Sequence, residues 1–197
     1  MKAYYHARAS EYDEWWLGVG RYAERRRAGW DEARTALEGA IRDLPPARTL
    51  DVACGTGFMT RHLRGEIVAL DQSEAMVAIA RQRLPYAQVI RGDALELPFP
   101  DGSFDRVFAS YFYCHLEDQD RIRFLAEARR VASELVIVGS LRREGLPAER
   151  WEERILNDGS NWQVYKRFFE PQLLLEELGG GRVLLTYEDF FVMVASP

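Results

Sequence analysis

Two glycines directly after a short apolar run constrain this chain more than any other feature of its sequence. The segment Thr49–Thr60 reads T-L-D-V-A-C-G-T-G-F-M-T, and its apolar part leads into Gly55 and Gly57. Glycine permits positive φ angles and lets a ligand approach the backbone closely. We therefore predict a strand, a tight turn and then a helix over residues 58–64, whose free N–H groups would suit an anionic or electron-rich ligand. Glycines at an ordinary strand-to-helix turn are the structural alternative.

Strands and helices alternate from residue 49 to about residue 140, which predicts a mostly parallel sheet covered on both faces. Asp31 and Asp118 are expected N-caps of two flanking helices, and another helix is expected to start at about Ser73. Further strands are expected at 66–70, 87–91, 104–110 and 135–138, and a closing helix begins at Pro171, before strands at 182–187 and 190–194 joined by a turn near Glu188-Asp189. Gly65 is expected to close the helix that follows the glycine turn.

Asp71 stands at the end of the second predicted strand, where ligands of open α/β sheets bind. Its carboxylate can accept both hydroxyls of a ribose, or it can cap the helix that starts at about Ser73. Its position favours the ribose.

Composition excludes several classes of protein. The 197 residues suffice for one substantial core, and the net charge of −5 argues against a general nucleic-acid binder. No apolar run approaches the roughly 20 residues of a membrane span, and the N-terminus does not resemble a signal peptide. Cys54 and Cys114 lack metal or redox spacing, so we expect no metal site and a cytoplasmic location. Arg25-Arg26-Arg27 is expected to form a solvated face.

The glycine turn resembles the motif of the class I S-adenosylmethionine-dependent methyltransferases, an acidic residue followed by x-G-x-G-x-G. Asp51 is the acidic residue, and Ala53 replaces the first glycine. The segment 92–110, G-D-A-L-E-L-P-F-P-D-G-S-F-D-R-V-F-A-S, resembles a second signature of the same family. The dinucleotide fingerprint G-x-G-x-x-G does not fit, because Thr60 replaces its last glycine. The order of the motifs, more than any one of them, supports the resemblance.

The resemblance implies a three-layer α/β sandwich with a seven-stranded, mostly parallel sheet, an antiparallel last strand and a Rossmann-like methyltransferase fold. It implies a single domain with four parts: an N-terminal lid and helix (1–45), a cofactor-binding core (46–140), a substrate-side insertion (141–170), and a closing helix and strand pair (171–197). For the insertion, a capping helix and loop packed by tryptophans is an equal alternative.

The resemblance also implies which residues bind S-adenosylmethionine and its product S-adenosylhomocysteine. Asp93 would face the adenine amino group and the Ala94 N–H a ring nitrogen, while Tyr5 and Tyr12 would belong to a segment that closes over the cofactor. These rings can equally serve only to pin the terminus onto the core. The complete expected cofactor set is Tyr5, Tyr12, Asp51, Ala53, Cys54, Gly55, Gly57, Asp71, Gln72, Met76, Asp93, Ala94, Leu95 and Ser110.

On the acceptor side, the resemblance makes His115 a candidate general base, because relatives often carry histidine just past the fourth strand. Some members need no base, and a lone histidine is often structural. The expected substrate-binding residues are Trp15, Tyr111, Tyr113, Trp151 and Tyr165.

The predicted reaction is in-line transfer of a methyl group from S-adenosylmethionine to a small-molecule acceptor. RNA or protein as acceptor, a non-catalytic cofactor-binding module and a nicotinamide-dependent oxidoreductase are the alternatives. The sequence leaves the acceptor open and admits a homodimer.

Overall fold

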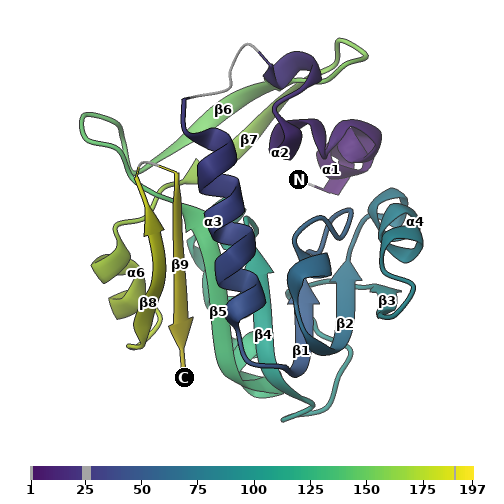
Figure 1. Cartoon of the computed structure of the whole chain (residues 1–197), viewed down its shortest axis with the longest axis vertical. Coiled ribbons are helices and arrows are strands. Elements are labelled where there is room, and N and C mark those ends of the chain that lie inside the picture. The colour runs from purple at the N-terminus through teal and green to yellow at the C-terminus, as the bar shows by residue number, and fades with distance from the viewer. Residues whose placement is uncertain (1, 24–27, 189) are drawn as a thin grey trace.

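The centre of the computed structural model is one sheet of seven strands (Figure 1), and the structure describes residues 2–23, 28–188 and 190–197. Its strands are β1 (Ala47–Val52), β2 (Gly65–Asp71), β3 (Gln88–Arg91), β4 (Phe104–Ser110), β5 (Ala132–Ser140), β8 (Arg182–Tyr187) and β9 (Phe191–Ser196). They lie in the order β3-β2-β1-β4-β5-β9-β8. The first five run parallel, and β9 pairs antiparallel with both β5 and β8. The predicted α/β sheet with an antiparallel last strand is confirmed.

Helices cover both faces of this sheet. Successive residues 107–109 of β4 and 136–138 of β5 are all fully buried, although neighbouring side chains in a strand point to opposite faces. In Figure 1, α3 crosses the front of the sheet and α4 lies beside β3. The covering helices are α3 (Trp30–Asp43), α4 (Glu74–Arg83), α5 (Asp118–Val131) and α6 (Pro171–Glu177).

Two further units lie over the end of the sheet at which β1 and β2 terminate (Figure 1). The first is the N-terminal segment, with α1 (Lys2–Arg8), α2 (Glu14–Leu17) and the 3-10 turns η1 (Ala9–Glu11) and η2 (Gly20–Tyr22). The second is an antiparallel hairpin of β6 (Glu149–Ile155) and β7 (Asn161–Arg167). The capping helix considered for this insertion is therefore not formed.

The helix predicted over residues 58–64 is wrong, because this segment contains only the 3-10 turn η3 (Thr60–His62). Gly65 does not close a helix but begins β2, where it pairs with Ala47 at the start of β1. The chain must therefore return along the six residues of β1, about 20 Å at 3.3 Å per residue. A helix over residues 58–64 would span only about 10 Å. The ligand therefore meets no helix N-terminus at this turn.

Two expected N-caps are also shifted by a residue or two. Gly29 and Glu117 occupy the N-cap positions of α3 and α5, so Asp31 and Asp118 lie in the first helical turns. A carboxylate there still stabilises the helix through its dipole. Ser73 does cap α4, since its hydroxyl accepts a hydrogen bond from the Met76 N–H at 3.3 Å. Arg25–Arg27 and Asp189 of the expected turn lie outside the described residues.

Candidate active site

A narrow crevice of about 40 Å³ opens at the carboxyl ends of β1, β2 and β4. Ala53 follows β1, Asp71 ends β2 and Ser110 ends β4, so the sheet itself brings these three residues together. The crevice is lined by Tyr5, Tyr12, Ala53, Gly55, Asp71, Gln72, Met76, Ser110, Tyr111, Phe112 and His115. Eight members of the expected cofactor set thus lie around one cavity.

Asp71 joins the glycine turn to the start of α4. Its Oδ2 accepts a hydrogen bond from the Gly55 N–H at 2.9 Å, and its Oδ1 accepts one from the Ser73 N–H at 2.8 Å. Burial raises the pKa of this carboxyl, and the two backbone hydrogen bonds oppose that rise. Each oxygen keeps acceptor capacity for a ligand hydroxyl. Asp71 therefore can support the loop and bind a ribose at once.

Three features of the crevice are typical of a ligand-binding site. Ala53 has a φ of +56°, an uncommon angle for a residue with a Cβ, and such strain concentrates at binding sites. A Cβ added to Gly55 would lie 3.4 Å from Cε1 of Tyr12, so the tyrosine ring covers the turn closely. Ser110 Oγ is buried without a hydrogen-bond partner among the described residues, which leaves it for a ligand.

Asp51 lies deeper, in a smaller cavity that also includes Cys54, Ala53 and Ser110. Burial raises the pKa of Asp51 to about 7; a hydrogen bond from Thr60 Oγ1 at 2.5 Å opposes this rise, and the nearby Asp71 adds to it. Burial also raises the pKa of the Cys54 thiol well above its usual value, which does not suit a nucleophile. The acidic residue of the motif is thus a buried carboxyl beneath the crevice, with a pKa of about 7.

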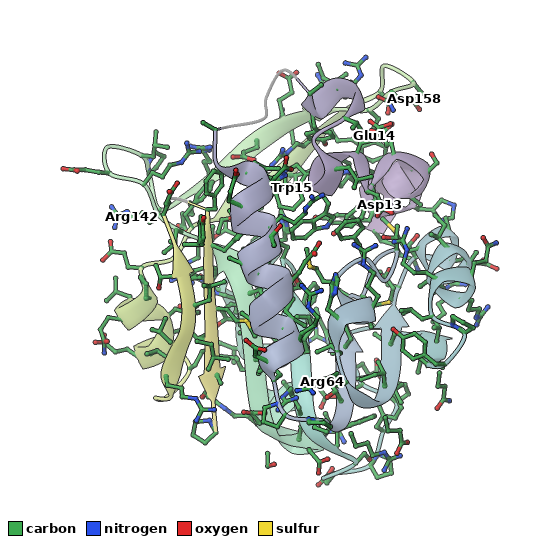
Figure 2. The ribbon with its side chains drawn as sticks, viewed as in Figure 1. Asp13, Glu14, Trp15, Arg64, Arg142 and Asp158 are labelled. Carbon is green, nitrogen blue, oxygen red and sulfur yellow. The ribbon has the colours of Figure 1, made fainter. Side chains whose placement is uncertain are left out.

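The N-terminal segment is held against the glycine turn by charged and polar contacts. Asp13 accepts a hydrogen bond from Thr56 Oγ1 at 2.6 Å and pairs with Arg83 at 2.5 Å. Arg83 also donates to the carbonyl oxygen of Thr56 at 2.9 Å. Figure 2 shows Asp13, Glu14 and Trp15 together above the sheet, near Asp158 of the hairpin turn. No sequence pattern signals these contacts, since Asp13 and Arg83 lie far apart in the chain.

A larger cavity of about 240 Å³ adjoins the crevice and shares Tyr5, Tyr12, Tyr111 and His115 with it. Its other walls come mainly from the N-terminal segment, including Trp15, and from the hairpin. The rest of the described lining is formed by Trp30, Ser140, Leu141, Arg143, Phe168 and Phe190. The ring of Trp15 lies 5.0 Å from that of Tyr111. The N-terminal segment therefore forms a common wall of the crevice and the larger cavity.

His115 stands at the boundary between the two cavities. Its Nδ1 lies 2.7 Å from the carbonyl oxygen of Tyr165, which can only accept, so Nδ1 carries the proton. Burial, and secondarily the nearby Lys166, lower the pKa of His115 well below its usual value. The ring is therefore neutral at physiological pH, and its Nε2 is a proton acceptor.

The hairpin presents one face to the larger cavity. Arg150, Glu152 and Arg154 of β6 line it, as do Val164 and Lys166 of β7, because alternate residues share a face. The expected substrate residues Trp151 and Tyr165 are cross-strand partners on the opposite face; Trp151 is 56% exposed. The residues that line the cavity, Arg150 and Lys166, are the sequence neighbours of these two expected residues. The rarity of lysine could have drawn attention to Lys166, because Lys2 is the one other lysine in this arginine-rich sequence.

The remaining expected site residues lie outside these cavities. Asp93 is exposed beyond β3 and accepts a hydrogen bond from the Leu95 N–H at 2.9 Å, next to the buried Ala94. Gly57 serves packing, since a Cβ there would lie 2.8 Å from Leu84 Cδ1. Tyr113 is fully buried, and its hydroxyl donates to Glu177 at 2.5 Å.

Among the described residues, no cluster of three or more histidine, cysteine or acidic side chains is arranged to hold a metal ion. Within the same residues, every helix is too short or too polar to cross a membrane.

Comparisons with known proteins agree with this geometry. Residues 50–135 match the model of a family described as "Methyltransferase domain". A demethylmenaquinone methyltransferase of Thermotoga maritima is 40% identical over 96 residues, which cover 46% of this chain and 41% of the relative. An ajmaline N-methyltransferase of Rauvolfia serpentina is 33% identical, with 61% of this chain and 47% of the relative covered. The chain thus spans less than half the length of these two relatives.

A solved structure described as "DhpI-SAM-HEP complex" superposes with a TM-score of 0.79 and 27% identity, covering 99% of this chain and 95% of the other. The match therefore includes the N-terminal segment and the hairpin as well as the sheet. With the glycine turn, Asp71 and the antiparallel last strand in place, the chain is similar in sequence and fold to the class I S-adenosylmethionine-dependent methyltransferases.

Proposed function

We propose that this protein transfers the methyl group of S-adenosylmethionine to a small-molecule acceptor. The observation that carries the proposal is the pair of adjoining cavities, a crevice at the strand ends and a larger cavity, which share Tyr5, Tyr12, Tyr111 and His115. A methyl transfer needs two ligands that meet at one boundary, with the reacting atoms aligned.

In the crevice, Asp71 would accept the ribose hydroxyls, and the backbone of the turn at Ala53 and Gly55 would lie against the cofactor. Gln72 and Met76 would contribute further contacts as crevice walls. Asp93 and the backbone of Ala94 and Leu95 would bind the adenine, since they follow β3 at the same edge of the sheet. When bound, S-adenosylmethionine supplies a sulfonium methyl group that is already reactive.

His115 would take the proton that the acceptor loses. Its neutral ring, with Nδ1 bonded to the Tyr165 carbonyl, presents Nε2 as the basic atom. Tyr5, whose ring lies 6.0 Å from that of His115, would exclude water from this boundary. The N-terminal segment, α1 to η2, would act as the lid of the site, held closed by the contacts between Asp13, Thr56 and Arg83.

A small-molecule acceptor is favoured by the walls of the larger cavity. Of its described lining residues, only Tyr111 and His115 fall within the segment 50–135 that matches the family model, so that match concerns mainly the cofactor half of the site. We also expect a location in the cytoplasm, because both described cysteines are free thiols. A homodimer and the absence of nucleic-acid substrates remain predictions.

The test is turnover of S-adenosylmethionine with a panel of acceptors, followed by mass spectrometry of S-adenosylhomocysteine and the methylated product. Transfer to a small molecule would support the proposal. Cofactor binding without transfer to any small molecule, RNA or protein would identify a non-catalytic binding module instead, and transfer to RNA or protein alone would replace the proposed acceptor class.

A further inference from the structure

The larger cavity is strongly cationic, although the chain as a whole carries a net charge of −5. Among the described residues, five basic side chains line it, Arg8, Arg143, Arg150, Arg154 and Lys166, beside one carboxylate, Glu152. Glu152 is shared, since it accepts hydrogen bonds from Arg150 at 2.7 and 3.0 Å and from Arg154. The positive charge of the cavity therefore exceeds what its own acidic group can neutralise.

Arg8 is the first cation without a counter-ion among the described residues. Its side chain belongs to a residue only 8% exposed, and its Nε has no hydrogen-bond partner there. The guanidinium carbon lies 4.9 Å from the ring centre of Tyr12 and 5.5 Å from that of Tyr22. Ring faces stabilise a cation in part, but a guanidinium does not lose its proton and still needs acceptors.

Lys166 is the second such residue, and it is 6% exposed. Its Nζ donates to the Cys114 sulfur, a weak acceptor, at 3.2 Å and lies 4.8 Å from the ring centre of Tyr111. In the described part of the chain, no carboxylate lies within ion-pair distance of it. Its cross-strand partner in the hairpin is Arg150, so β6 and β7 place two cations side by side on the cavity face.

Burying cations of like sign is unfavourable unless a counter-charge pairs with them. A bound anion would supply that counter-charge. The cavity that holds these cations also includes His115 in its wall. Lys166, Arg154 and Arg8 all act on His115 in the same sense, since each lowers its pKa. The cations therefore surround the position that the acceptor would occupy.

We propose that the methyl acceptor is a small anion, a molecule bearing a phosphate, phosphonate, sulfonate or carboxylate group, held by Arg8 and Lys166 beside His115. This inference rests on the proposed function and adds to it the chemical class of the acceptor. Arg8 belongs to α1, so the bound anion also ties the N-terminal segment to the hairpin. An uncharged quinone would leave both cations unpaired.

The test measures binding of four probes by calorimetry, in HEPES buffer, to protein saturated with S-adenosylhomocysteine. The probes are inorganic phosphate, methylphosphonate, methanesulfonate and acetate, and a neutral naphthohydroquinone serves as comparison. We expect saturable binding of at least one anion. Lys166→Met and Arg8→Met should each weaken it at least tenfold, while Lys166→Arg retains most of the affinity. Arg142→Met is the matched control, because Arg142 is exposed, pairs with Glu170 and does not line the cavity.

The outcomes separate the two proposals. S-adenosylhomocysteine binding without binding of any anion, or anion binding that Lys166→Met and Arg142→Met change equally, would overturn the anionic acceptor and leave the methyltransferase intact. Anion binding by protein that cannot bind S-adenosylhomocysteine would retain the anion site and refute the methyltransferase. Circular dichroism and the affinity for S-adenosylhomocysteine report whether each variant is folded. If Lys166→Met does not fold, the comparison of Arg8→Met with Lys166→Arg and Arg142→Met still tests the anion site.

Discussion

Replacing Asp51 by asparagine should stabilise the protein at alkaline pH. The carboxyl is buried beneath the crevice with a pKa of about 7 in the folded state, against an ordinary value of 3.8. Asparagine has the same shape and keeps an oxygen that accepts the hydrogen bond from Thr60 Oγ1. The substitution therefore removes the charge and little else.

The size of the effect follows from the two pKa values. Because the folded-state pKa is raised, the protonated carboxyl stabilises the fold fully below pH 3.8, and this contribution is lost as pH rises towards the folded pKa of about 7. At about 1.4 kcal/mol per pKa unit, the loss reaches about 4 kcal/mol at pH 8 and about 2 kcal/mol at pH 5. The free energy of unfolding of Asp51→Asn should therefore exceed that of the original protein by about 2 kcal/mol more at pH 8 than at pH 5.

Urea unfolding at pH 8 and pH 5, without cofactor, measures both free energies. Asp120→Asn is the control, because the Asp120 side chain is 47% exposed on α5 and its ion pair and helix-dipole contributions should not exceed about 1 kcal/mol at either pH. Equal stability of Asp51→Asn and the original protein at pH 8, or a gap independent of pH, would refute the reasoning. The same variant should bind S-adenosylhomocysteine more weakly if this carboxylate contributes to the site.

Two further predictions concern the reaction and the core. His115→Gln should keep the affinity for S-adenosylhomocysteine and slow turnover at least 100-fold, as expected for loss of a general base; unchanged turnover would remove His115 from the mechanism. Because burial lowers the pKa of His115, the rate of the original protein should stay flat as pH falls from 8 to 6.5, and a fall there that His115→Gln abolishes would contradict this. Trp16→Ala should reduce the free energy of unfolding by about 3–5 kcal/mol in urea titrations, because Trp16 is 2% exposed and stacks on Phe58 at 5.6 Å. A loss below about 1 kcal/mol would show that this ring adds little to the core.

Local patterns predicted the sheet and the residues at its strand ends well. Strand β4 covers Phe104–Ser110, the bounds predicted for it, and Asp71 and Ser110 lie at the expected edge because parallel strands end together. The helix over 58–64 failed for a non-local reason. Pairing of Gly65 with Ala47 forces the chain to return along β1, a constraint absent from residues 58–64 themselves.

The acceptor cavity was harder to predict, because its walls depend on register and distant contacts. Strand β6 carries charged residues on both faces, so no apolar alternation indicates which face is buried. Trp151 and Tyr165 were expected in the site as aromatic residues of the insertion, whereas the register of the hairpin places Arg150 and Lys166 on the cavity face. Arg8 was missed because its role depends on α1 folding back over the sheet.

The proposed function depends on one property of the protein, the binding of S-adenosylmethionine by Asp71 in the crevice at the strand ends. Calorimetric titration with S-adenosylhomocysteine tests it most directly, with Asp71→Ala compared with the exposed-site control Asp120→Ala. We expect binding in the micromolar range, at least tenfold weaker in Asp71→Ala and unchanged in Asp120→Ala. Folded protein that does not bind the ligand, or equal affinity of Asp71→Ala and the original protein, would contradict it.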